Sequence, residues 1–394
     1  MEGNFSAELI QDKQIAIVGG GPGGLSLARM LQIRGGQVTV YERDASRMAR
    51  VQGSSLDLHA DSGQLLIQAA GLMEAFAKVA RPEGEQHRIY DKHGCLVLDI
   101  PAYQVASSRP EIDRGVLRDL LLDALKPGTV QWNKRFVALE ATAAGGYLLT
   151  FEDGSRAQVD IVIAADGANS RIRPYITDIR PHYSGTTLIQ GEVEKPAISC
   201  PEVHEMVHQG NMIVLGDEKG LMLQQKGDGT LIFYATAKHP EHWVRTVGID
   251  FAVKAKAVDF LTQFYAGWNP AFFTLFNASS HFVPRPMYGT PVHQQWDTQP
   301  ALTMIGDAAH VMPPFAGVGV NMAMLDALEL ANCLTDPAFT DVTAAIHAYE
   351  IAMLARSAAA QERTKTSEDI FHAPTAIADL LKKLGCKAAA GGRF

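Results

Sequence analysis

A glycine-rich segment near the N-terminus has the residue types and the spacing of a phosphate-binding turn. Glycines stand at Gly19, Gly21 and Gly24, the pattern G-x-G-x-x-G. In such a turn the first glycine permits the tight bend, the second lets the backbone approach a pyrophosphate, and the third lets a helix pack closely on a strand. The N–H groups at the start of that helix bear partial positive charge. The segment therefore predicts a dinucleotide site.

The elements around this turn support the prediction. The β-branched run Ile15–Val18 precedes the turn, and residues 25–31 follow it with helical periodicity. The next strand, Gln37–Tyr41, ends at Glu42, about 20 residues beyond the turn, where an acidic side chain accepts hydrogen bonds from a ribose. The alternative is that Glu42 is a solvated carboxylate at a strand end, but its spacing from the turn favours the ribose contact.

Two later strands also end in acidic residues and glycines. The apolar run 159–165 is followed by Asp166-Gly167, and the run 302–305 is followed by Gly306-Asp307. Ligands of open α/β sheets bind at the carboxyl ends of the strands. Asp307 could bind a ribose or ribityl hydroxyl, and backbone N–H groups of residues 313–321 could stabilise negative charge on a reduced flavin. The three segments together predict FAD.

These segments, in this order, resemble the three fingerprints of the single-component (group A) FAD-dependent monooxygenases, which have the aromatic hydroxylase fold. The resemblance covers nearly the whole chain. Within that family the chain most resembles the TetX-type tetracycline monooxygenases. That narrower resemblance is seen in the sequences VYERD at 40–44, SLDLH at 55–59 and MIGDAAHVMPPFAG at 304–317.

The pattern and the resemblance together predict an α/β protein. We expect a Rossmann-like FAD-binding domain with an inserted antiparallel β-sheet substrate domain and a long C-terminal helix that bridges both. The FAD-binding domain should comprise residues 1–80, 102–176 and 285–340, and the substrate domain residues 81–101 and 177–284. Alternating runs in 174–283 predict a sheet with one polar and one buried face, interrupted by one helix near 252–265. Residues 341–384 should be helical, and 385–394 a disordered tail.

Carried over by position, the resemblance implies a set of residues that contact FAD. They are Gly19, Gly21, Gly24, Glu42, Arg43, Asp57, Arg114, Asp166, Asp307, Pro314, Gly317, Val320 and Asn321. It also implies that Arg50 helps to bind NADPH, and that the substrate meets Gln190, Met212, Ile232, Tyr234, Phe315 and Gly317. His59 and Tyr234 are further pocket candidates, with a structural role as the more ordinary explanation for each.

Three substrate positions depart from the TetX-type pattern. Met212 stands where that family has an arginine, Ile232 where it has a histidine, and Tyr234 where it has a glycine. FAD chemistry is therefore better supported by the sequence than tetracycline as the substrate.

By resemblance we expect a monooxygenase that uses FAD, NADPH and O₂ to hydroxylate a polycyclic phenol or enol, with tetracycline, and hence antibiotic inactivation, as one candidate. NADPH would reduce FAD, O₂ would add at C4a, and the hydroperoxide would transfer oxygen. No catalytic protein residue is expected, because an acidic phenol or enol arrives ionised. Two alternatives stay open: a group A hydroxylase of a smaller aromatic acid or purine, and a non-catalytic FAD-binding protein.

Length and composition limit the other possibilities. At 394 residues, with 47% hydrophobic and 20% charged residues, the chain is typical of a globular protein of about two domains. Its net charge of −8 and its lack of a basic cluster argue against a nucleic-acid partner. It has neither a signal-peptide pattern nor an apolar run of about 18 residues. We therefore expect a cytoplasmic monomer without stable membrane insertion.

One motif points to different chemistry. Residues His204–His208 satisfy H-E-x-x-H, which on a helix presents two zinc ligands and a general base. Pro201 and Gly210 leave little room for a helix, so we expect a strand and a hairpin turn here, and no metal. The four cysteines lack C-x-x-C spacing and suggest neither a disulfide framework nor a zinc site.

Overall fold

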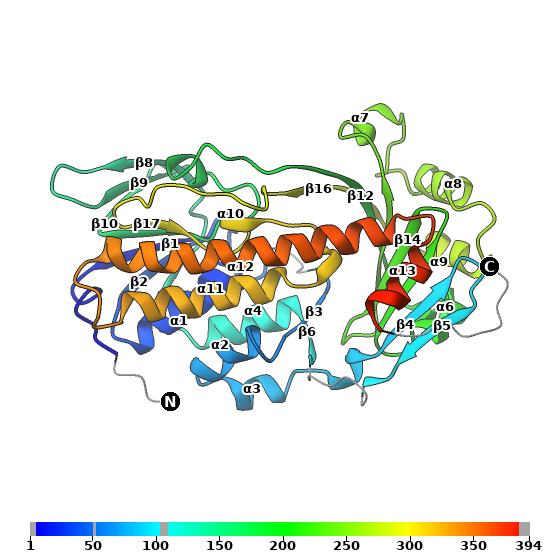
Figure 1. Ribbon diagram of the computed structural model, residues 1–394, viewed down its shortest axis with the longest axis horizontal. Helices are drawn as coiled ribbons and strands as arrows, with labels where there is room; N and C mark the ends of the chain where they lie inside the picture. The colour runs from blue at the N-terminus through cyan, green and yellow to red at the C-terminus, as the bar shows by residue number, and fades with distance from the viewer. Residues whose placement is uncertain (1–4, 50–52, 103–108, 386–394) are drawn as a thin grey trace. The chain divides into compact units, whose positions relative to one another are not determined.

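The computed structural model describes residues 5–49, 53–102 and 109–385 (Figure 1). The chain divides into two compact units. Unit 1 comprises Met1–Ala80, Arg114–His182 and Gly289–Glu362, and unit 2 comprises Arg81–Asp113, Tyr183–Tyr288 and Arg363–Phe394.

A five-stranded parallel sheet forms the centre of unit 1. Its order is β17-β11-β1-β2-β7, and every neighbouring pair is parallel. The strands are β1 Gln14–Val18, β2 Gln37–Tyr41, β7 Val130–Gln131, β11 Ile161–Ala164 and β17 Leu302–Met304. All four residues of β11 are buried, as expected for a parallel strand with both faces covered. The carboxyl ends of all five strands therefore lie along one edge.

Helices and a small antiparallel sheet complete unit 1 (Figure 1). Helix α1 packs against α11, which also packs against α2. The helices are α1 Pro22–Ile33, α2 Gly63–Ala69, α3 Met73–Ala77, α4 Arg114–Asp123, α10 Asp307–His310 and α11 Gly319–Leu334. The short strand β3 is Ser55–Asp57, and the antiparallel sheet contains β8 Phe136–Ala141, β9 Tyr147–Phe151 and β10 Arg156–Val159.

A seven-stranded sheet forms unit 2, in the order β16-β12-β15-β14-β13-β4-β5. Strands β13 and β4 are parallel, whereas β12/β15, β15/β14, β14/β13 and β4/β5 are antiparallel. The strands are β4 His87–Asp91, β5 Leu96–Ile100, β12 His182–Val193, β13 Asn211–Gly216, β14 Lys219–Gln225, β15 Leu231–Lys238 and β16 Phe282–Gly289. Strand β6 is Glu111–Asp113.

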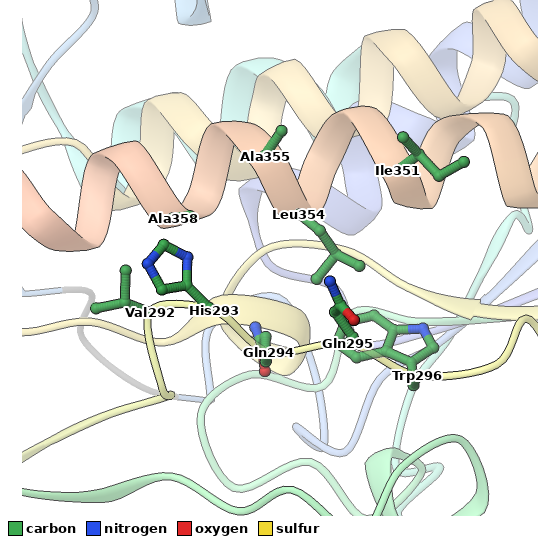
Figure 2. A pocket seen from close by; sticks show the side chains of 9 residues that line it. All are labelled: Val292, His293, Gln294, Gln295, Trp296, Ile351, Leu354, Ala355 and Ala358. Carbon is green, nitrogen blue, oxygen red and sulfur yellow. The ribbon is translucent and has the colours of Figure 1, made fainter.

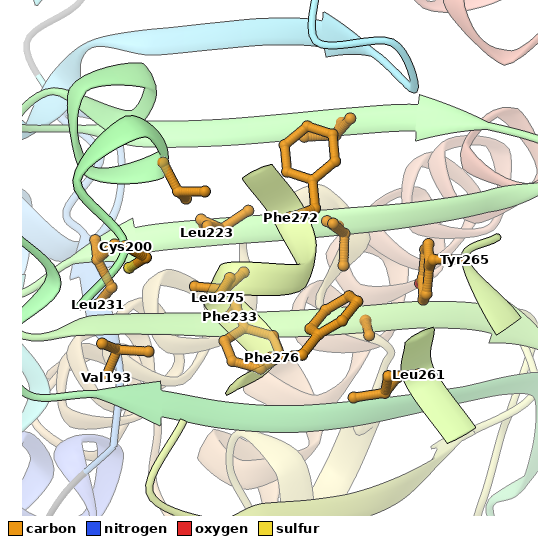
Figure 3. Packing of buried hydrophobic residues seen from close by; sticks show 14 of the residues in the cluster. Val193, Cys200, Leu223, Leu231, Phe233, Leu261, Tyr265, Phe272, Leu275 and Phe276 are labelled. Atoms are coloured by element: carbon orange, nitrogen blue, oxygen red, sulfur yellow. The ribbon is translucent and has the colours of Figure 1, made fainter. Parts of the chain in front are cut away.

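One face of this sheet packs on a hydrophobic cluster (Figure 3). Alternate strand residues such as Leu223 and Phe233 meet Tyr265, Phe272 and Phe276 from the helices, all with at most 1% exposure. The helices of unit 2 are α5 Pro196–Ser199, α6 Pro201–Val207, α7 Trp243–Thr246, α8 Lys254–Phe264 and α9 Ala271–Ala278. The period of two places the intervening side chains on the opposite face, which we call the polar face.

Two sequence predictions for this region were wrong. Several helices, not one, interrupt the strands: α8 matches the predicted 252–265, but α9 was missed because its sequence AFFTLFNA lacks a polar stripe. The H-E-x-x-H segment is the helix α6, not a strand. Pro201 occupies the first helical position, where its missing N–H breaks no helical hydrogen bond. His208 follows the helix with φ +61°, so it is not a helical ligand.

The predicted fold class is confirmed: the protein is α/β, with a parallel sheet in unit 1 and sheets that are wholly or mostly antiparallel in the rest of the chain. The long C-terminal helix is also present, as α12 Val342–Phe371, followed by α13 Ala376–Lys383. The chain passes from unit 1 to unit 2 within α12. Among the described residues, no helix combines the length and apolar character that crossing a membrane requires. The predicted tail from 386 onward lies outside the described residues.

Candidate functional site

Four predicted cofactor positions come together at the carboxyl edge of the unit 1 sheet. Gly19 follows β1, Glu42 follows β2, Asp166 lies just beyond β11, and Asp307 lies just beyond β17. The strand ends are in direct contact, since a Cβ built at Gly19 would lie 2.2 Å from the carbonyl oxygen of Ala165. Parallel pairing therefore gathers segments that are far apart in the sequence, at the edge where α/β proteins bind ligands.

The glycine turn is fixed by its own backbone. Gly19 has φ +115°, and a Cβ at Gly24 would lie 2.1 Å from the carbonyl oxygen of Gly19. A Cβ at Gly21, by contrast, would meet nothing within 4 Å. Helix α1 starts at Pro22 with no side chain capping its N-terminus. The turn therefore presents unpaired helix N–H groups next to open space, an arrangement that fits a diphosphate.

Glu42 is a buried carboxylate rather than a solvated one. It is 4% exposed, its Oε2 accepts a hydrogen bond from the Gly20 N–H at 2.6 Å, and its Oε1 accepts one from the Asp44 N–H at 2.8 Å. Each carboxylate oxygen has a second lone pair that can still accept a ligand hydroxyl. Glu42 therefore links the glycine turn to the loop after β2 as well as facing the predicted ribose position.

Arg118 is a structural residue of this site that the sequence did not reveal. It is 3% exposed and donates to the carbonyl oxygens of Gly20 at 3.3 Å and Arg47 at 3.0 Å. Arg114, one turn earlier on α4, is exposed, and its guanidinium has no hydrogen bond to any described residue. Arg43 is likewise exposed. Arg118 therefore clamps the turn, whereas Arg114 and Arg43 have guanidinium groups available for a ligand.

Asp166 has a carboxylate oxygen that lacks a partner. Its Oδ2 accepts from the Arg171 N–H at 2.8 Å, while its Oδ1 is buried without a hydrogen bond to the described residues. Burial raises the pKa of Asp166 above its ordinary value. A buried acceptor without a donor is costly unless a ligand or water supplies one. The predicted ribityl or ribose hydroxyl is such a donor.

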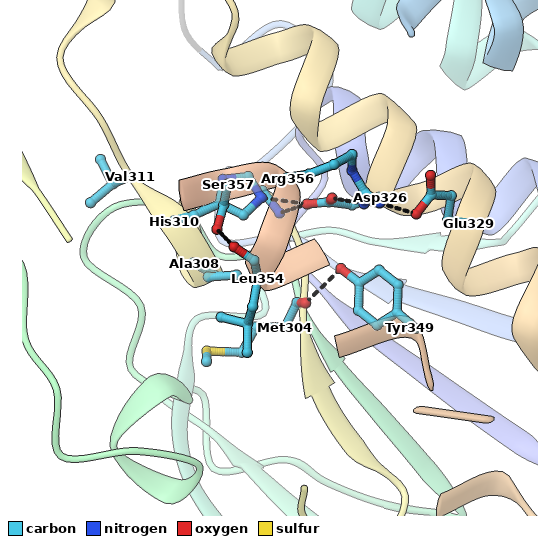
Figure 4. Close-up of polar contacts among 12 residues, drawn as sticks. Met304, Ala308, His310, Val311, Asp326, Glu329, Tyr349, Leu354, Arg356 and Ser357 are labelled. Atoms are coloured by element: carbon cyan, nitrogen blue, oxygen red, sulfur yellow. Dashed lines mark hydrogen bonds and ion pairs between the residues drawn. The ribbon is translucent and has the colours of Figure 1, made fainter. Parts of the chain in front are cut away.

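A buried ionic network holds the turn that precedes Asp307 (Figure 4). Asp326 is fully buried, and its Oδ2 accepts from the Gly306 N–H at 2.9 Å and from His310 Nε2 at 2.6 Å. Its Oδ1 accepts from Arg356 at 3.0 Å, and Arg356 also pairs with Glu329. Because Gly306 has φ +59°, this network fixes a backbone conformation that few other residues adopt.

The network also sets the charge state of its members. Burial by itself would lower the pKa of His310, but Asp326 outweighs burial and raises it. Burial would raise the pKa of Asp326, but His310 and Arg356 together lower it. Both directions favour the charged pair of an imidazolium and a carboxylate. Asp307 is exposed between buried neighbours, so its carboxylate remains free for a ligand hydroxyl.

The residues predicted around the flavin ring divide into two kinds. Asn321 is 2% exposed and fully used: its Nδ2 donates to the Asp57 carbonyl oxygen at 2.8 Å, and its Oδ1 accepts from the His59 N–H at 2.8 Å. The Asp57 carboxylate contacts His59 Nε2 at 2.8 Å. Asn321 and His59 thus position the segment around Asp57, the structural role expected for His59.

The loop before α11 is held close to Asp57. Gly317 has φ +65°, and a Cβ there would lie 3.7 Å from Asp57 Oδ1. Pro314 and Gly317 are exposed, while Phe315 is 8% exposed. Val320 lies in the first turn of α11, whose N-terminus has no side-chain cap. The loop and the start of α11 therefore present backbone N–H groups, as the sequence predicted.

Two of the predicted substrate residues are cross-strand neighbours on the polar face of unit 2. Gln190 on β12 is paired in register with Tyr234 on β15. Ile232 is on the same face but is 1% exposed. Thr236, also on this face, contacts His372 Nε2 through its hydroxyl at 2.9 Å, so the segment after α12 borders the face.

Met212 does not join this group. It has no exposed surface and belongs to the hydrophobic cluster on the other face of the sheet. Its placement does not favour a substrate contact. The reason is register: β13 places Met212 opposite Leu223, whose side chain faces the helices, whereas Ile213 faces the polar side.

Arg285 on β16 is a polar-face residue that the sequence analysis missed. It is exposed, and its Nε–H donates to Gln190 Oε1 at 2.7 Å. Its position between Pro284 and Pro286 gave no regular alternation from which its face could be predicted. The polar face therefore has a guanidinium as well as the amide and the phenol.

Unit 1 also has a surface hollow, which lies away from the predicted site residues in the sequence and is lined by different side chains (Figure 2). It has a volume of about 350 Å³ and is lined by residues 292–296 and by the α12 side chains Ile351, Leu354, Ala355 and Ala358. It contains none of the predicted site residues. Arg50, predicted to help bind NADPH, lies outside the described residues. Within the described part of the chain, no three His, Cys, Asp or Glu side chains converge as metal ligands would.

The comparisons with known proteins agree with the geometry of unit 1. The family model described as an FAD binding domain matches residues 12–364. The chain belongs to this FAD-binding family. Monooxygenase asqM of Emericella nidulans is 30% identical over 373 residues, covering 82% of this chain and 83% of the relative. The FAD-binding protein is therefore an oxidoreductase of the group A monooxygenase type, as predicted.

Solved structures show the same fold. Klebsiella pneumoniae HpxO, complexed with FAD and uric acid, has a TM-score of 0.78 at 22% identity, covering 96% of this chain and 94% of that chain. The tetracycline destructase Tet(51) has a TM-score of 0.70 at 17% identity, covering 94% of each. At these identities the likeness concerns the fold alone. The aromatic hydroxylase fold and FAD as the cofactor are confirmed, and the TetX-type resemblance stays a prediction.

The residues of unit 1 fit FAD on chemical grounds. The open space at Gly21 beside an uncapped helix suits the diphosphate, and the unpartnered Asp166 oxygen suits a hydroxyl donor. The exposed Asp307 and the uncapped start of α11 suit the ribityl chain and the end of the ring that gains negative charge on reduction.

Proposed function

We propose that this FAD-dependent monooxygenase uses NADPH and O₂ to hydroxylate a polycyclic phenol or enol bound at the polar face of unit 2. The observation that supports this substrate site most strongly is the pairing of Gln190 with Tyr234, beside Arg285, on the face that the hydrophobic cluster leaves uncovered. A polar, partly aromatic surface of this kind suits a flat, oxygen-rich molecule.

Bound FAD supplies the redox and oxygen-activating chemistry. The contribution of the chain is to bind and orient. The turn at Gly21 and the start of α1 would hold the diphosphate, and Asp166 and Asp307 would accept hydrogen bonds from hydroxyls. Helix α11 would stabilise negative charge on the ring through its N-terminal N–H groups. On the polar face, Gln190 would hydrogen-bond the substrate and Tyr234 would stack on it. No protein base is required, because an acidic phenol or enol arrives ionised.

Tetracycline is one candidate within this class, supported by the motifs at 40–44, 55–59 and 304–317. Met212 and Ile232 depart from the TetX-type pattern, but both side chains are buried. These two departures therefore do not count against tetracycline as the substrate. A second candidate is a smaller aromatic acid or purine. The bulk of Tyr234, where the TetX-type pattern has glycine, favours that smaller substrate.

The test is mass spectrometry of candidate substrates incubated with the holoenzyme, NADPH and O₂. Tetracycline, simple phenols, aromatic acids and purines would be compared for a gain of one oxygen and for stimulated NADPH oxidation. A product with one added oxygen supports the proposal and identifies the candidate. Slow NADPH oxidation that no compound stimulates, with no oxygenated product, would instead indicate a non-catalytic flavoprotein.

A further inference from the structure

The contact between Arg285 and Gln190 determines which polar groups the face offers. A guanidinium has N–H donors and no acceptor. Because Arg285 Nε donates to Gln190 at 2.7 Å, the amide must turn its oxygen toward Arg285. The amide nitrogen Nε2 is left as the free group of Gln190, with no hydrogen bond to the described residues. The nitrogen groups of the pair that remain without a partner are therefore all N–H donors.

The positive charge of this pair is not neutralised within the described part of unit 2. Glu192 lies two residues from Gln190 on the same face of β12, but it already pairs with Lys226 at 2.8 Å. Lys238 and Asp369 likewise form their own pair at 3.1 Å. Arg285 forms no ion pair with any described carboxylate, and its two terminal nitrogens are free for a bidentate contact.

We infer that Arg285, aligned with the free amide nitrogen of Gln190, is an anion anchor that selects substrates bearing a negatively charged oxygen. Two terminal N–H groups in a planar fork match a carboxylate, and the neighbouring amide N–H adds a third donor. A phenolate or enolate oxygen has the same chemistry with one oxygen fewer. This inference rests on the proposed role of the polar face as the substrate site.

The same geometry works against neutral or donor-bearing groups. A carboxamide in place of a carboxylate would turn either its oxygen or its NH₂ toward the Arg285 guanidinium and the Gln190 Nε2–H groups, neither of which can accept a hydrogen bond. It would therefore leave one donor facing donors, which costs affinity because that donor loses its water. The discrimination is thus between two molecules of nearly equal shape that differ in charge and in one donor.

The experiment is an equilibrium titration of the holoenzyme in which the absorbance of bound FAD reports ligand binding. The probes are benzoate and 2-naphthoate, each compared with its neutral carboxamide, and 2-naphthol is added at a pH that ionises it. The two acids test the carboxylate at two sizes, and 2-naphthol tests the phenolate. The variants are Arg285→Met, which removes the charge, and Arg285→Lys, which keeps the charge but loses the fork.

Arg245→Met is the matched control, because Arg245 is an exposed arginine of unit 2 whose guanidinium hydrogen-bonds only His242 among the described residues. We expect at least one anionic probe to bind the wild type roughly tenfold or more tightly than its carboxamide. Arg285→Met should weaken the binding of that anion by roughly tenfold to a hundredfold and leave the affinity for the carboxamide unchanged. Arg285→Lys should retain part of the preference, and Arg245→Met all of it.

Three results would overturn the inference. The first is a wild type that binds each acid no better than its carboxamide, and the second is a wild type that binds no anionic probe at all. The third is an Arg285→Met variant in which the binding of acid and carboxamide is weakened equally, as replacement of a purely structural residue would cause. Because the titration requires no turnover, its outcome is separate from that of the proposed function. A protein that hydroxylates nothing can still show the anion preference, and an active hydroxylase can lack it.

Discussion

The carboxyl edge of the unit 1 sheet and the polar face of the unit 2 sheet are built in opposite ways. At the edge, the shape comes from backbone conformation, and the side chains around it are buried and already bonded, as in Glu42, Asn321 and Asp326. On the polar face, the chemistry comes from side chains such as Tyr234 and the exposed Arg285, which have few partners.

This difference separates what a cofactor requires from what a substrate requires. A cofactor with a fixed shape requires backbone N–H groups at fixed positions. Those positions depend on glycines, because other residues rarely adopt the required backbone conformations. A substrate is recognised by side chains on a sheet, which change without disturbing the strand pairing. The family match therefore specifies FAD, whereas in the proposed function the side chains of the polar face would select the substrate.

The largest effect is expected at a glycine. Gly24→Ala would place a Cβ 2.1 Å from the Gly19 carbonyl oxygen and should abolish FAD binding together with much of the stability of unit 1. Gly21→Ala meets no protein atom within 4 Å, so it should keep the unfolding transition of the apoprotein while weakening FAD. Thermal unfolding and FAD titration of both variants check this. If both variants lost the same stability, Gly24 could not be distinguished from Gly21 as the glycine required for packing.

A charge placed on either side of the unit 2 sheet should have opposite consequences. Met212→Arg would bury a guanidinium in the hydrophobic cluster and destabilise the protein by more than about 4 kcal/mol, whereas Ile213→Arg, on the polar face, should remain folded. Denaturant unfolding measures both. If Met212→Arg folded normally and Ile213→Arg did not, the assignment of the faces would be reversed.

The Asp326–His310 pair should make stability depend on pH. A raised pKa in the folded state means that the contribution of His310 is complete below its ordinary value of 6.5 and is lost as the pH rises through the raised pKa. The lowered pKa of Asp326 acts in the other direction, with its contribution present above 3.8 and lost in more acidic solution.

His310→Asn removes the basic limb of this dependence. The difference in unfolding free energy between wild type and variant should be about 1–3 kcal/mol at pH 6 and should shrink as the solution becomes alkaline. Chemical denaturation across that range measures it. A difference that stays constant with pH would mean that folding does not raise the pKa of His310.

The smallest effect is expected at Tyr234. Replacing it with glycine, the residue of the TetX-type pattern, should leave FAD affinity and stability nearly unchanged, because the side chain is on the partly exposed polar face. The ratio of kcat/KM for a polycyclic over a monocyclic substrate should rise by roughly tenfold, about the effect of removing one steric barrier. An unchanged ratio would show that Tyr234 does not limit the size of the substrate.

Much of unit 1 could be predicted from the sequence because its signals are local. The strand Ile161–Ala164 is apolar throughout, and Gly19, Asp166 and Gly306 each lie within two residues of the end of a strand, so parallel pairing alone brings them together. What escaped prediction depends on tertiary contacts. Arg118 and Asp326 are on ordinary helical positions, and only the fold shows that each reaches back to a glycine turn.

Unit 2 was harder because its faces depend on register. Met212 and Ile213 are adjacent apolar residues, and only the pairing with β14 shows which of them faces the cluster. Arg285 stands between two prolines, where alternation gives no guidance. Helix α6 is hard to predict because Pro201 argues against a helix in most positions. Proline is well tolerated at the first helical position, where Pro201 stands.

FAD binding depends on the backbone of unit 1 and not on the side chains of the polar face. Calorimetric titration of FAD into the apoprotein of the wild type, Gly21→Ala and Arg285→Met tests it directly. We predict one FAD per chain for the wild type, unchanged affinity for Arg285→Met and clearly weaker binding for Gly21→Ala. A wild type that binds no FAD, or an Arg285→Met variant that loses as much affinity as Gly21→Ala, would contradict the account.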